Sequence, residues 1–291
     1  MKTQFLARLL TTQLLAVSAT LAPAGDIDRE WEAEIAENLD ENTSDGEVIW
    51  CQAANSRFLT LYTGQTANLA KGAAIILHGM GAHPDWPEVI SPLRTSLPEL
   101  GWSTLSIQLP VLAPETPVAD YGNTLQEAGQ RTGAAVRLLH DMGFSHIVII
   151  GHSFGAAIGA EYLAGTTGND ILAFVSIGIQ SQKFLNPTLD ILARIEKIKI
   201  PVLDIYGSRD LESVTATVAD RRLAARKGGN HAYQQVEIKD ADHSITGFEP
   251  VLVKHIRDWL DKTLSAIAIM DEHDRDREID PAGKEHTTGT E

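Results

Sequence analysis

Short apolar runs alternate with longer amphipathic segments along most of this chain. Each short run has the length of a strand buried on both faces, and the longer segments place apolar residues at helical spacing. Such alternation is typical of a mostly parallel sheet that helices cover on both faces. We expect strands at residues 48–53, 58–63, 73–77, 103–109, 147–150, 171–177, 201–206 and 232–238, and helices at 85–100, 123–142, 156–163, 188–195, 212–226 and 248–267.

The first of these helices has a clear predicted start and two prolines in its interior. Asp85 with Glu88 three residues later forms a capping-box pattern, which predicts that the helix begins there. Pro92 and Pro98 must bend or divide it. The sequence shows no internal repeat and no break within residues 48–270, so we expect one domain there.

The most informative segment, Gly151-His152-Ser153-Phe154-Gly155, joins an apolar strand to a helix of small residues. This is the strand–turn–helix context of a G-x-S-x-G nucleophile elbow. The two glycines remove the Cβ atoms that would clash where a strand folds directly into a helix. We therefore predict that Ser153 is a nucleophile held above the sheet. The alternative is a serine that serves only in a turn.

Across residues 48–270 the chain resembles the α/β-hydrolase superfamily. The resemblance implies an α/β-hydrolase fold with a doubly wound, mostly parallel sheet, and a catalytic triad in the chain order serine, acid, histidine. Asp210 ends Tyr206-Gly207-Ser208-Arg209-Asp210 after a strand, and His243 follows the last strand. A serine hydroxyl needs an imidazole to accept its proton, and a carboxylate holds that imidazole in the useful tautomer.

Each predicted partner of Ser153 has competitors. Asp204 lies within a strand and is expected to be a structural hydrogen-bond acceptor, whereas Glu212 begins a helix. Asp242 adjoins His243, and neighbours in sequence rarely point at each other. His243 itself could instead be a surface histidine that caps the last helix.

The resemblance also implies an oxyanion hole, in which two backbone N–H groups stabilise the negative oxygen of a tetrahedral intermediate. One donor is the residue after the nucleophile, Phe154. The other is Met80, in His78-Gly79-Met80-Gly81. A single glycine precedes Met80, so this loop is similar to the Gly-X form of the oxyanion loop and differs from the triple-glycine form.

Side chains from several loops are candidates for the substrate pocket: His78, His83, Trp86, Tyr121, His152 and Phe184. We expect His78 mainly to brace its loop, and His152 to pack beside the serine. Too few residues separate the strands ending at Ile177 and starting at Pro201 for a large helical cap, so the cap is predicted to be small or absent. A small lid at 180–192 and a loop at 110–122 would rim a shallow pocket.

The N-terminal residues predict export. Residues 1–24 carry Lys2 and Arg8, then an apolar stretch at 9–21, and end in Ala22-Pro23-Ala24. This is the pattern of a signal peptide, cleaved here after Ala24, which indicates a periplasmic or secreted protein. A membrane anchor is the alternative, although the stretch is short and interrupted for a membrane span.

A second resemblance agrees with that compartment. The segments His78–Pro87, Pro92–Arg94, Gly101-Trp102 and Gln108–Val111 are similar to a bacterial branch of exported α/β hydrolases. The similarity implies a fold and a compartment, and it implies no particular substrate.

The net charge of −15 belongs mainly to the two ends of the chain. Residues 25–47, an acidic N-terminal segment, hold ten acidic residues against one arginine, and residues 271–291 hold eight against three basic ones. The acidity is therefore no guide to a substrate. We expect residues 271–291 to form a disordered tail. Residues 28–39 could form an amphipathic helix through Trp31, Ile35 and Leu39.

The sequence predicts no cofactor and no metal. It contains no P-loop, no dinucleotide fingerprint and no cysteine–histidine set with metal-ligand spacing. The single cysteine, Cys51, cannot form an internal disulfide and lies in an apolar run, so we expect a buried thiol. Basic and aromatic residues do not cluster as a nucleic-acid surface requires. The expected partner is a small acyl or ester substrate, with no integral membrane segment after signal removal.

These features together predict a serine hydrolase that cleaves a carboxylic ester or thioester through an acyl-enzyme. Ser153 would attack, His243 would move the proton and Asp210 would orient the imidazole. Acyl transfer or peptide hydrolysis by the same triad is one alternative, and a binding protein without turnover is another. A serine at the elbow argues against haloalkane and epoxide chemistry, which uses an acidic nucleophile on this fold.

Overall fold

The computed structural model describes residues 27–43, 45–53, 56–166 and 170–279, so the predicted signal peptide lies outside the described residues. Its eight strands form one sheet in the order β1-β2-β4-β3-β5-β6-β7-β8. At one end β1 pairs antiparallel with β2, and β2 with β4; the other pairs are parallel. The bounds are β1 Glu47–Ala53, β2 Ser56–Thr63, β3 Gly72–Leu77, β4 Trp102–Ile107, β5 Ile147–His152, β6 Ala173–Ile177, β7 Val202–Gly207 and β8 Tyr233–Ile238.

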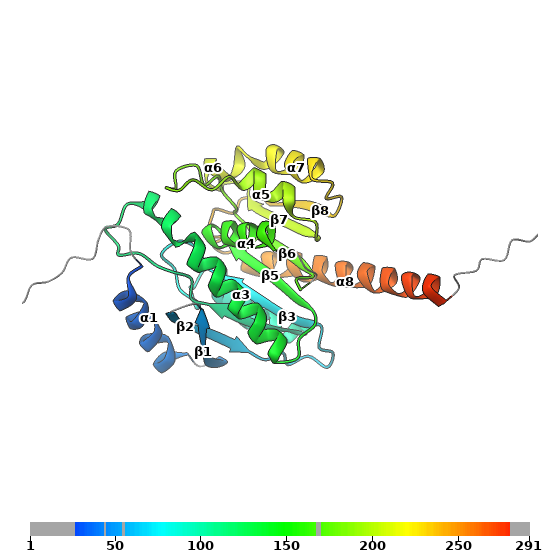
Figure 1. The fold of residues 1–291 in the computed structure, drawn as a ribbon, viewed down its shortest axis with the longest axis horizontal. Coiled ribbons are helices and arrows are strands. Elements are labelled where there is room, and N and C mark those ends of the chain that lie inside the picture. The colour runs from blue at the N-terminus through cyan, green and yellow to red at the C-terminus, as the bar shows by residue number, and fades with distance from the viewer. Residues whose placement is uncertain (1–26, 44, 54–55, 167–169, 280–291) are drawn as a thin grey trace, which may run out of the picture.

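Helices cover both faces of this sheet, as predicted (Figure 1). Neighbouring residues of each central strand point to opposite faces, so Ile75 and Ile149 pack under α3, α4, α5 and α7, whereas Ile76 and Ile150 pack under α2 and α8. The bounds are α2 Ile90–Ser96, α3 Leu125–Asp141, α4 Phe154–Gly165, α5 Ile191–Lys197, α6 Glu212–Thr215, α7 Val218–Lys227 and α8 Glu249–Ile279, with the 3-10 helices η1 Leu97–Leu100 and η2 Val118–Thr124.

The predicted start of the first body helix is wrong. Helix α2 begins at Ile90, and the Asp85 carboxylate does not cap it. Asp85 instead accepts a hydrogen bond of 2.9 Å from Nε of Arg94, which is 1% exposed. A buried guanidinium needs a carboxylate partner, and this requirement overrides the local capping pattern. The helix is divided where Pro98 suggested, because η1 replaces it at Leu97.

The helix predicted at 212–226 is two helices, α6 and α7. The break follows from Arg221, a buried residue of α7. Its Nη1 donates hydrogen bonds to the Val214 carbonyl at 2.8 Å and to the Thr217 hydroxyl at 2.7 Å. These contacts occupy the carboxyl end of α6, so the chain turns before the next helix begins.

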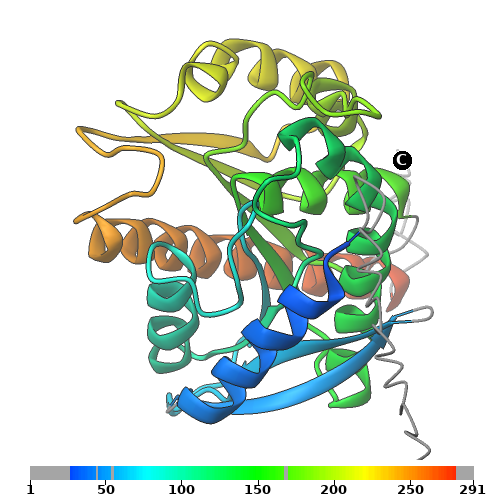
Figure 2. The same cartoon turned by 90° about the vertical axis from the view of Figure 1, so that its left-hand side faces the viewer.

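The acidic segment before β1 forms helix α1, Arg29–Asn42, which lies across the β1–β2 end of the sheet (Figure 2). Its buried residues are Glu32, Ala36 and Leu39, and Leu39 packs with Leu59 and Leu61 of β2. The predicted apolar face was partly wrong, because Trp31 is 39% exposed. Glu32 takes the inward position since a buried arginine of α3, Arg131, pairs with it.

A further difference concerns the carboxyl end of the described chain. Helix α8 continues to Ile279, well past the predicted end near residue 267, and so enters the segment predicted as a tail. No glycine or proline lies between Pro250, in the first turn of α8, and Pro281, which permits this extension. Residues 280–291 lie outside the described residues.

Cys51 is buried, as expected. Among the described helices, none has both the length and the apolar character for crossing a bilayer.

Candidate active site

Ser153 lies at the sharp turn between β5 and α4. Its backbone has φ 55° and ψ −116°, a strained conformation for a residue with a side chain. The Ser153 amide donates a hydrogen bond of 2.8 Å to the Ile177 carbonyl of the neighbouring strand, which holds the turn in place. The geometry is that of the predicted elbow.

The two elbow glycines are sterically required. A Cβ on Gly151 would lie 2.6 Å from the Ala156 nitrogen, and a Cβ on Gly155 would lie 2.2 Å from the Leu77 carbonyl oxygen. Both contacts are with backbone atoms that cannot move aside. The glycines therefore let α4 start directly against the carboxyl ends of β3 and β5.

The structure brings the three predicted triad side chains together. His243 lies in the loop after β8, and its Nε2 is 2.9 Å from the Ser153 hydroxyl oxygen. On the other side of the ring, Nδ1 is 2.6 Å from an Asp210 carboxylate oxygen. With Nδ1 donating to the carboxylate, Nε2 is free to accept the serine proton. The arrangement is thus suited to nucleophilic catalysis.

Asp210 is held by its own turn. Its carboxylate accepts hydrogen bonds from the backbone amides of Leu211 at 2.8 Å and Gly207 at 3.3 Å. Burial raises the pKa of Asp210, but the hydrogen bond from His243, its charge and these amides together lower that pKa below its usual value. Asp210 therefore remains an anion beside the imidazole.

The competing acids lie elsewhere. The Asp204 carboxylate is buried among Arg221, Tyr233 and Gln235, away from the imidazole. Glu212 is exposed at the start of α6, and Asp242 accepts a hydrogen bond from the Thr246 amide at 3.1 Å. Of the four candidates, Asp210 is the one that contacts His243.

The two predicted oxyanion donors flank the serine. Phe154 is the first residue of α4, and the loop carrying Met80 packs against the elbow, because a Cβ on Gly79 would lie 3.5 Å from the Ser153 Cβ. Within the described residues, neither the Phe154 amide nor the Met80 amide donates a hydrogen bond to a protein acceptor. Neither amide is therefore occupied by a partner within the described residues, and the helix dipole of α4 favours negative charge at the Phe154 amide.

His78 and Tyr121, two of the predicted pocket residues, are 1% and 6% exposed, so they support the loops around Ser153 from behind. The His78 Nδ1–H donates to the Gly79 carbonyl at 2.8 Å, and its Nε2 accepts from the Leu109 amide at 2.9 Å. Burial lowers the pKa of His78 to about 3, so the imidazole is neutral. Tyr121 packs edge-on against the Phe154 ring, with centroids 5.6 Å apart.

His152 and Gly178 position the imidazole. The His152 Nε2–H donates to the backbone carbonyl of His243 at 2.9 Å, and the two rings lie 5.1 Å apart. Burial, followed by the charge of His243, lowers the pKa of His152 to about 4. Gly178 was not singled out from the sequence. Its φ is +60°, and a Cβ there would come within 3.0 Å of the His243 ring.

Exposed apolar side chains lie on the segments that follow β3, β4, β6 and β7, at the carboxyl edge of the sheet where Ser153 also lies. They are Trp86, Val118, Phe184 and Leu211, with exposed fractions of 38%, 54%, 42% and 46%. His83 packs edge-on against Trp86 at 5.3 Å. Hydrogen bonds join three of these segments. The Asn186 amide donates to the Ala119 carbonyl, and the Ser181 amide donates to the Ser213 carbonyl. The segment between β6 and α5 contains no helix, so it supplies no helical cap over these side chains.

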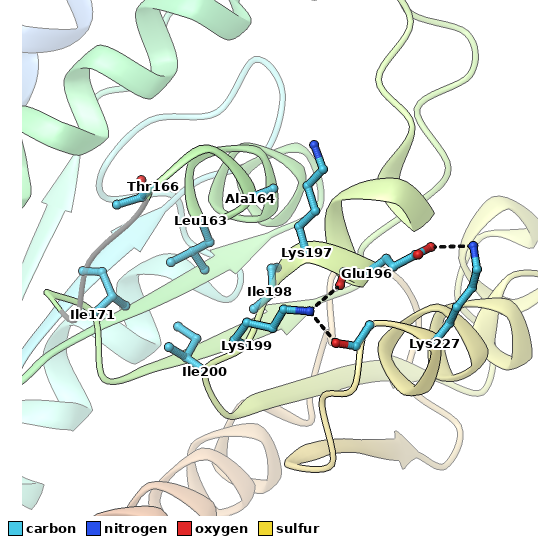
Figure 3. A pocket seen from close by; sticks show the side chains of 11 residues that line it. Leu163, Ala164, Thr166, Ile171, Glu196, Lys197, Ile198, Lys199, Ile200 and Lys227 are labelled. Carbon is cyan, nitrogen blue, oxygen red and sulfur yellow. Dashed lines mark hydrogen bonds and ion pairs between the residues drawn. The ribbon is translucent and has the colours of Figure 1, made fainter.

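A cavity of about 650 Å³ lies far from this chemistry, where β6 and β7 begin (Figure 3). Two of the three lysines that line it make polar contacts with neighbouring helices. Lys199 Nζ contacts the carbonyls of Glu196 and Gly228, and Lys227 Nζ lies 3.0 Å from the Glu196 carboxylate. Lys199 thus satisfies carbonyls at the carboxyl ends of α5 and α7, and Lys227 forms an ion pair with α5. In the described part of the chain, no three histidine, cysteine, aspartate or glutamate side chains gather as a metal site requires.

Comparisons with solved structures show the fold. Est1E from Butyrivibrio proteoclasticus matches with a TM-score of 0.62 and 14% identity, over 75% of this chain and 99% of that one. An esterase from Pyrococcus furiosus matches with a TM-score of 0.60 and 17% identity, over 74% and 90% of the two chains. A serine hydrolase without lid from Xanthomonas campestris matches with a TM-score of 0.58 and 14% identity, over 75% and 95%. The fold is that of the α/β-hydrolase superfamily, as predicted.

Sequence comparison gives the family. No curated protein matches the chain. A family model described as a protein of unknown function, DUF3530, matches residues 17–132 and 114–262, which together span most of the chain. The chain therefore belongs to the DUF3530 family of proteins, and it has the α/β-hydrolase fold.

Proposed function

We propose that the protein is a serine hydrolase that cleaves carboxylic esters through an acyl-enzyme. The observation that carries the proposal is the pair of short contacts on His243, at 2.9 Å to Ser153 and 2.6 Å to Asp210. A serine, an imidazole and a carboxylate in this order form a proton-transfer unit that a purely structural role does not require.

In the first half of the reaction, the Ser153 oxygen attacks the ester carbonyl carbon while its proton moves to His243 Nε2. The carbonyl oxygen becomes negative and is stabilised by the N–H groups of Phe154 and Met80. Asp210 stabilises the imidazolium that has formed. The carbon–oxygen bond to the alcohol then breaks, His243 returns the proton to the departing alcohol, and the acyl group stays on Ser153.

In the second half, water attacks the acyl-enzyme and gives a proton to His243 Nε2. A second oxyanion forms in the same place. It collapses as Ser153 leaves and takes the proton back from His243, which releases the carboxylic acid. The same residues act twice, and no other co-reactant is needed.

The apolar rim supports an ester with an apolar acyl or alcohol group. Trp86, Val118, Phe184 and Leu211 would remove such a group from water on binding. Ferulic acid is bound in one solved structure of Est1E, and other similar structures include an esterase, a dienelactone hydrolase and a monoglyceride lipase. These similarities favour ester substrates as the first panel to try.

The test is labelling with a fluorophosphonate, which reacts with an activated serine, together with turnover of 4-nitrophenyl esters. Wild-type protein should be labelled and should turn over the esters. Ser153→Ala should abolish labelling and lower kcat by roughly 10⁴–10⁶. Ser265→Ala, at an exposed serine of α8, is the matched control and should behave as wild type.

Three outcomes would change the proposal. Labelling that survives Ser153→Ala would remove Ser153 from its role. Labelling without ester turnover would favour acyl transfer or peptide hydrolysis, which an added amine or alcohol acceptor and a peptide panel would reveal. Wild-type protein with neither labelling nor turnover would favour a binding protein that keeps the fold.

We also propose that the enzyme acts outside the cytoplasm, after cleavage of the signal peptide at Ala24. N-terminal sequencing of protein recovered from the periplasm or the medium tests this. The expected first residue is Gly25. A product in the cytoplasm that still begins at residue 1 would contradict the proposal.

A further inference from the structure

A continuous chain of hydrogen bonds links a buried arginine of α3 to the oxyanion loop. Arg131 Nη1 donates to the Gln108 carbonyl at 3.0 Å. The next link is the Leu109 amide, which donates to His78 Nε2 at 2.9 Å. His78 Nδ1–H then donates to the Gly79 carbonyl at 2.8 Å. Every donor along this chain points toward the oxyanion loop.

Two planar peptide groups carry the chain onward. The Gln108 carbonyl and the Leu109 amide belong to one peptide, and the Gly79 carbonyl and the Met80 amide belong to another. In a trans peptide the C=O and the N–H point in opposite directions, so a partner that fixes the carbonyl also aims the amide. The Gly79 carbonyl also accepts a hydrogen bond of 3.2 Å from the Ala82 amide, so His78 and Ala82 together fix this peptide and with it the direction of the Met80 N–H.

The series of hydrogen bonds also has an electrostatic direction. It begins at a permanent positive charge, and hydrogen bonds in series polarise one another in a low-dielectric interior. His78 is neutral, with Nδ1 as donor and Nε2 as acceptor, because burial lowers its pKa to about 3. Both links through the imidazole thus persist at neutral pH.

Arg131, at the start of this series of hydrogen bonds, is itself held by two carboxylates. Arg131 is fully buried, and its Nη2 lies 2.8 Å from Glu32 of α1 and 2.7 Å from Glu127 of α3. Helix α1 also contacts the segment that carries the chain, because the Asp28 amide donates to the Val111 carbonyl at 2.9 Å. These two carboxylates already neutralise the charge of Arg131. The hydrogen bond from its Nη1 to the Gln108 carbonyl is therefore not needed for charge neutralisation.

We propose that Arg131 is a positioning residue for the oxyanion hole, which acts through the 108–109 peptide and His78 to fix and polarise the Met80 N–H, with α1 as its support. This inference rests on the proposed function, since it needs a reaction in which an oxyanion forms. It gives the acidic helix before the sheet a role in catalysis at a distance.

The main test is Arg131→Lys. A lysine keeps a positive charge beside Glu32 and Glu127, but a single ammonium cannot reproduce the planar fork that also reaches Gln108. We expect kcat for a 4-nitrophenyl ester to fall roughly ten- to a hundredfold. KM should stay within about twofold, because the lost interaction acts on the transition state. Arg137→Lys, at an exposed arginine on the same helix, is the matched control and should leave both constants unchanged.

Glu32→Gln is the second variant, and it decides the question if Arg131→Lys does not fold. It loosens the support from α1 while Glu127 still pairs with Arg131. We expect kcat to fall by about threefold or more at unchanged KM, with a parallel fall in the rate of fluorophosphonate labelling. Glu34→Gln, at an exposed position of α1, should have no effect. Circular dichroism at the assay temperature shows whether each variant is folded.

A folded variant of either residue with kcat within about twofold of wild type would overturn the inference. A loss that appears in KM alone, or one that the control variants share, would also overturn it. Wild-type protein that neither reacts with fluorophosphonate nor turns over esters would instead contradict the proposed function. Active wild-type protein with unaffected variants would contradict this inference alone.

Discussion

Two aspartates near the end of β7, Asp204 and Asp210, have the same side chain and opposite surroundings. Asp204 is fully buried within the strand and accepts hydrogen bonds from Arg221 at 2.9 Å, Tyr233 at 2.7 Å and Gln235 at 2.9 Å. Asp210 follows the strand and accepts from two backbone amides and from His243. The difference lies in the partner, because a guanidinium keeps its proton and an imidazole gives it up.

The two aspartates thus have a structural role in β7 and a proposed catalytic role just after it. A carboxylate whose partners never titrate can only hold elements together, and here it joins β6, β7, β8 and α7. A carboxylate with one titrating partner can respond when that partner gains a proton. Substitutions at the two positions should therefore change different measurements.

The largest effect is expected from Asp210→Asn. An asparagine at this position can stabilise the wrong tautomer of His243 and cannot stabilise the imidazolium, so kcat should fall by about 10⁴. The free energy of unfolding should change little, because the amide can still accept from the backbone of Leu211. Ester turnover and urea unfolding of the same preparation measure both. A loss of kcat below about tenfold would contradict the role given to Asp210.

Asp204→Asn should show the reverse pattern. It leaves the buried Arg221 guanidinium without its carboxylate, which typically costs about 3–5 kcal/mol of folding free energy. The kcat of the protein that remains folded should stay within a few-fold of wild type, as the triad geometry is not touched. Asp258→Asn, at an exposed carboxylate of α8 paired with Lys254 and Arg257, is the control and should be far milder. Equal destabilisation by both variants would contradict the distinction.

Much of the sheet and of the candidate triad could be predicted because their signals are local. The elbow is a five-residue pattern between two regular elements, and Asp210 follows a strand in a turn. The position of Asp204 inside a strand was by itself enough to exclude it as the triad acid. These inferences need only the nearest residues and the known order of the fold.

The contacts that could not be predicted join distant parts of the chain. Glu32 and Arg131 are 99 residues apart, and nothing beside Glu32 indicates that a guanidinium will neutralise it. The same holds for Arg94, whose burial removes Asp85 from the predicted cap. The need for glycine at 178 depends on the His243 ring, which reaches it from a later loop. Local patterns alone therefore misplaced Trp31 on the buried face of α1 and gave the wrong start of α2.

Acid should weaken the fold through histidines beside the triad that are buried and neutral. The folded-state pKa of His152 is about 4 and that of His78 about 3, both below the unfolded value of 6.5. Between these values the unfolded chain binds more protons, so unfolding becomes easier as pH falls below 6.5, by up to about 1.4 kcal/mol per pH unit for each group. Urea unfolding from pH 7 to pH 4 measures this slope, and His152→Gln should flatten it. A slope that is the same in wild type and variant would contradict the neutral state of His152.

The smallest expected effect tests the structural role of Asp204. Tyr233→Phe removes one of the donors to the Asp204 carboxylate, a hydrogen bond of 2.7 Å, while Arg221 and Gln235 continue to bond it. Because the anion keeps its charged partner, the loss should be about 1–2 kcal/mol of unfolding free energy, and kcat should not change. Tyr206→Phe is the control on the neighbouring strand. Its hydroxyl has no hydrogen-bond partner among the described residues that would be lost, so its unfolding midpoint in urea should match wild type. A fall in kcat in Tyr233→Phe without a change in unfolding would mean that the Asp204 cluster supports the reaction directly, and the separation between the two aspartates would no longer hold.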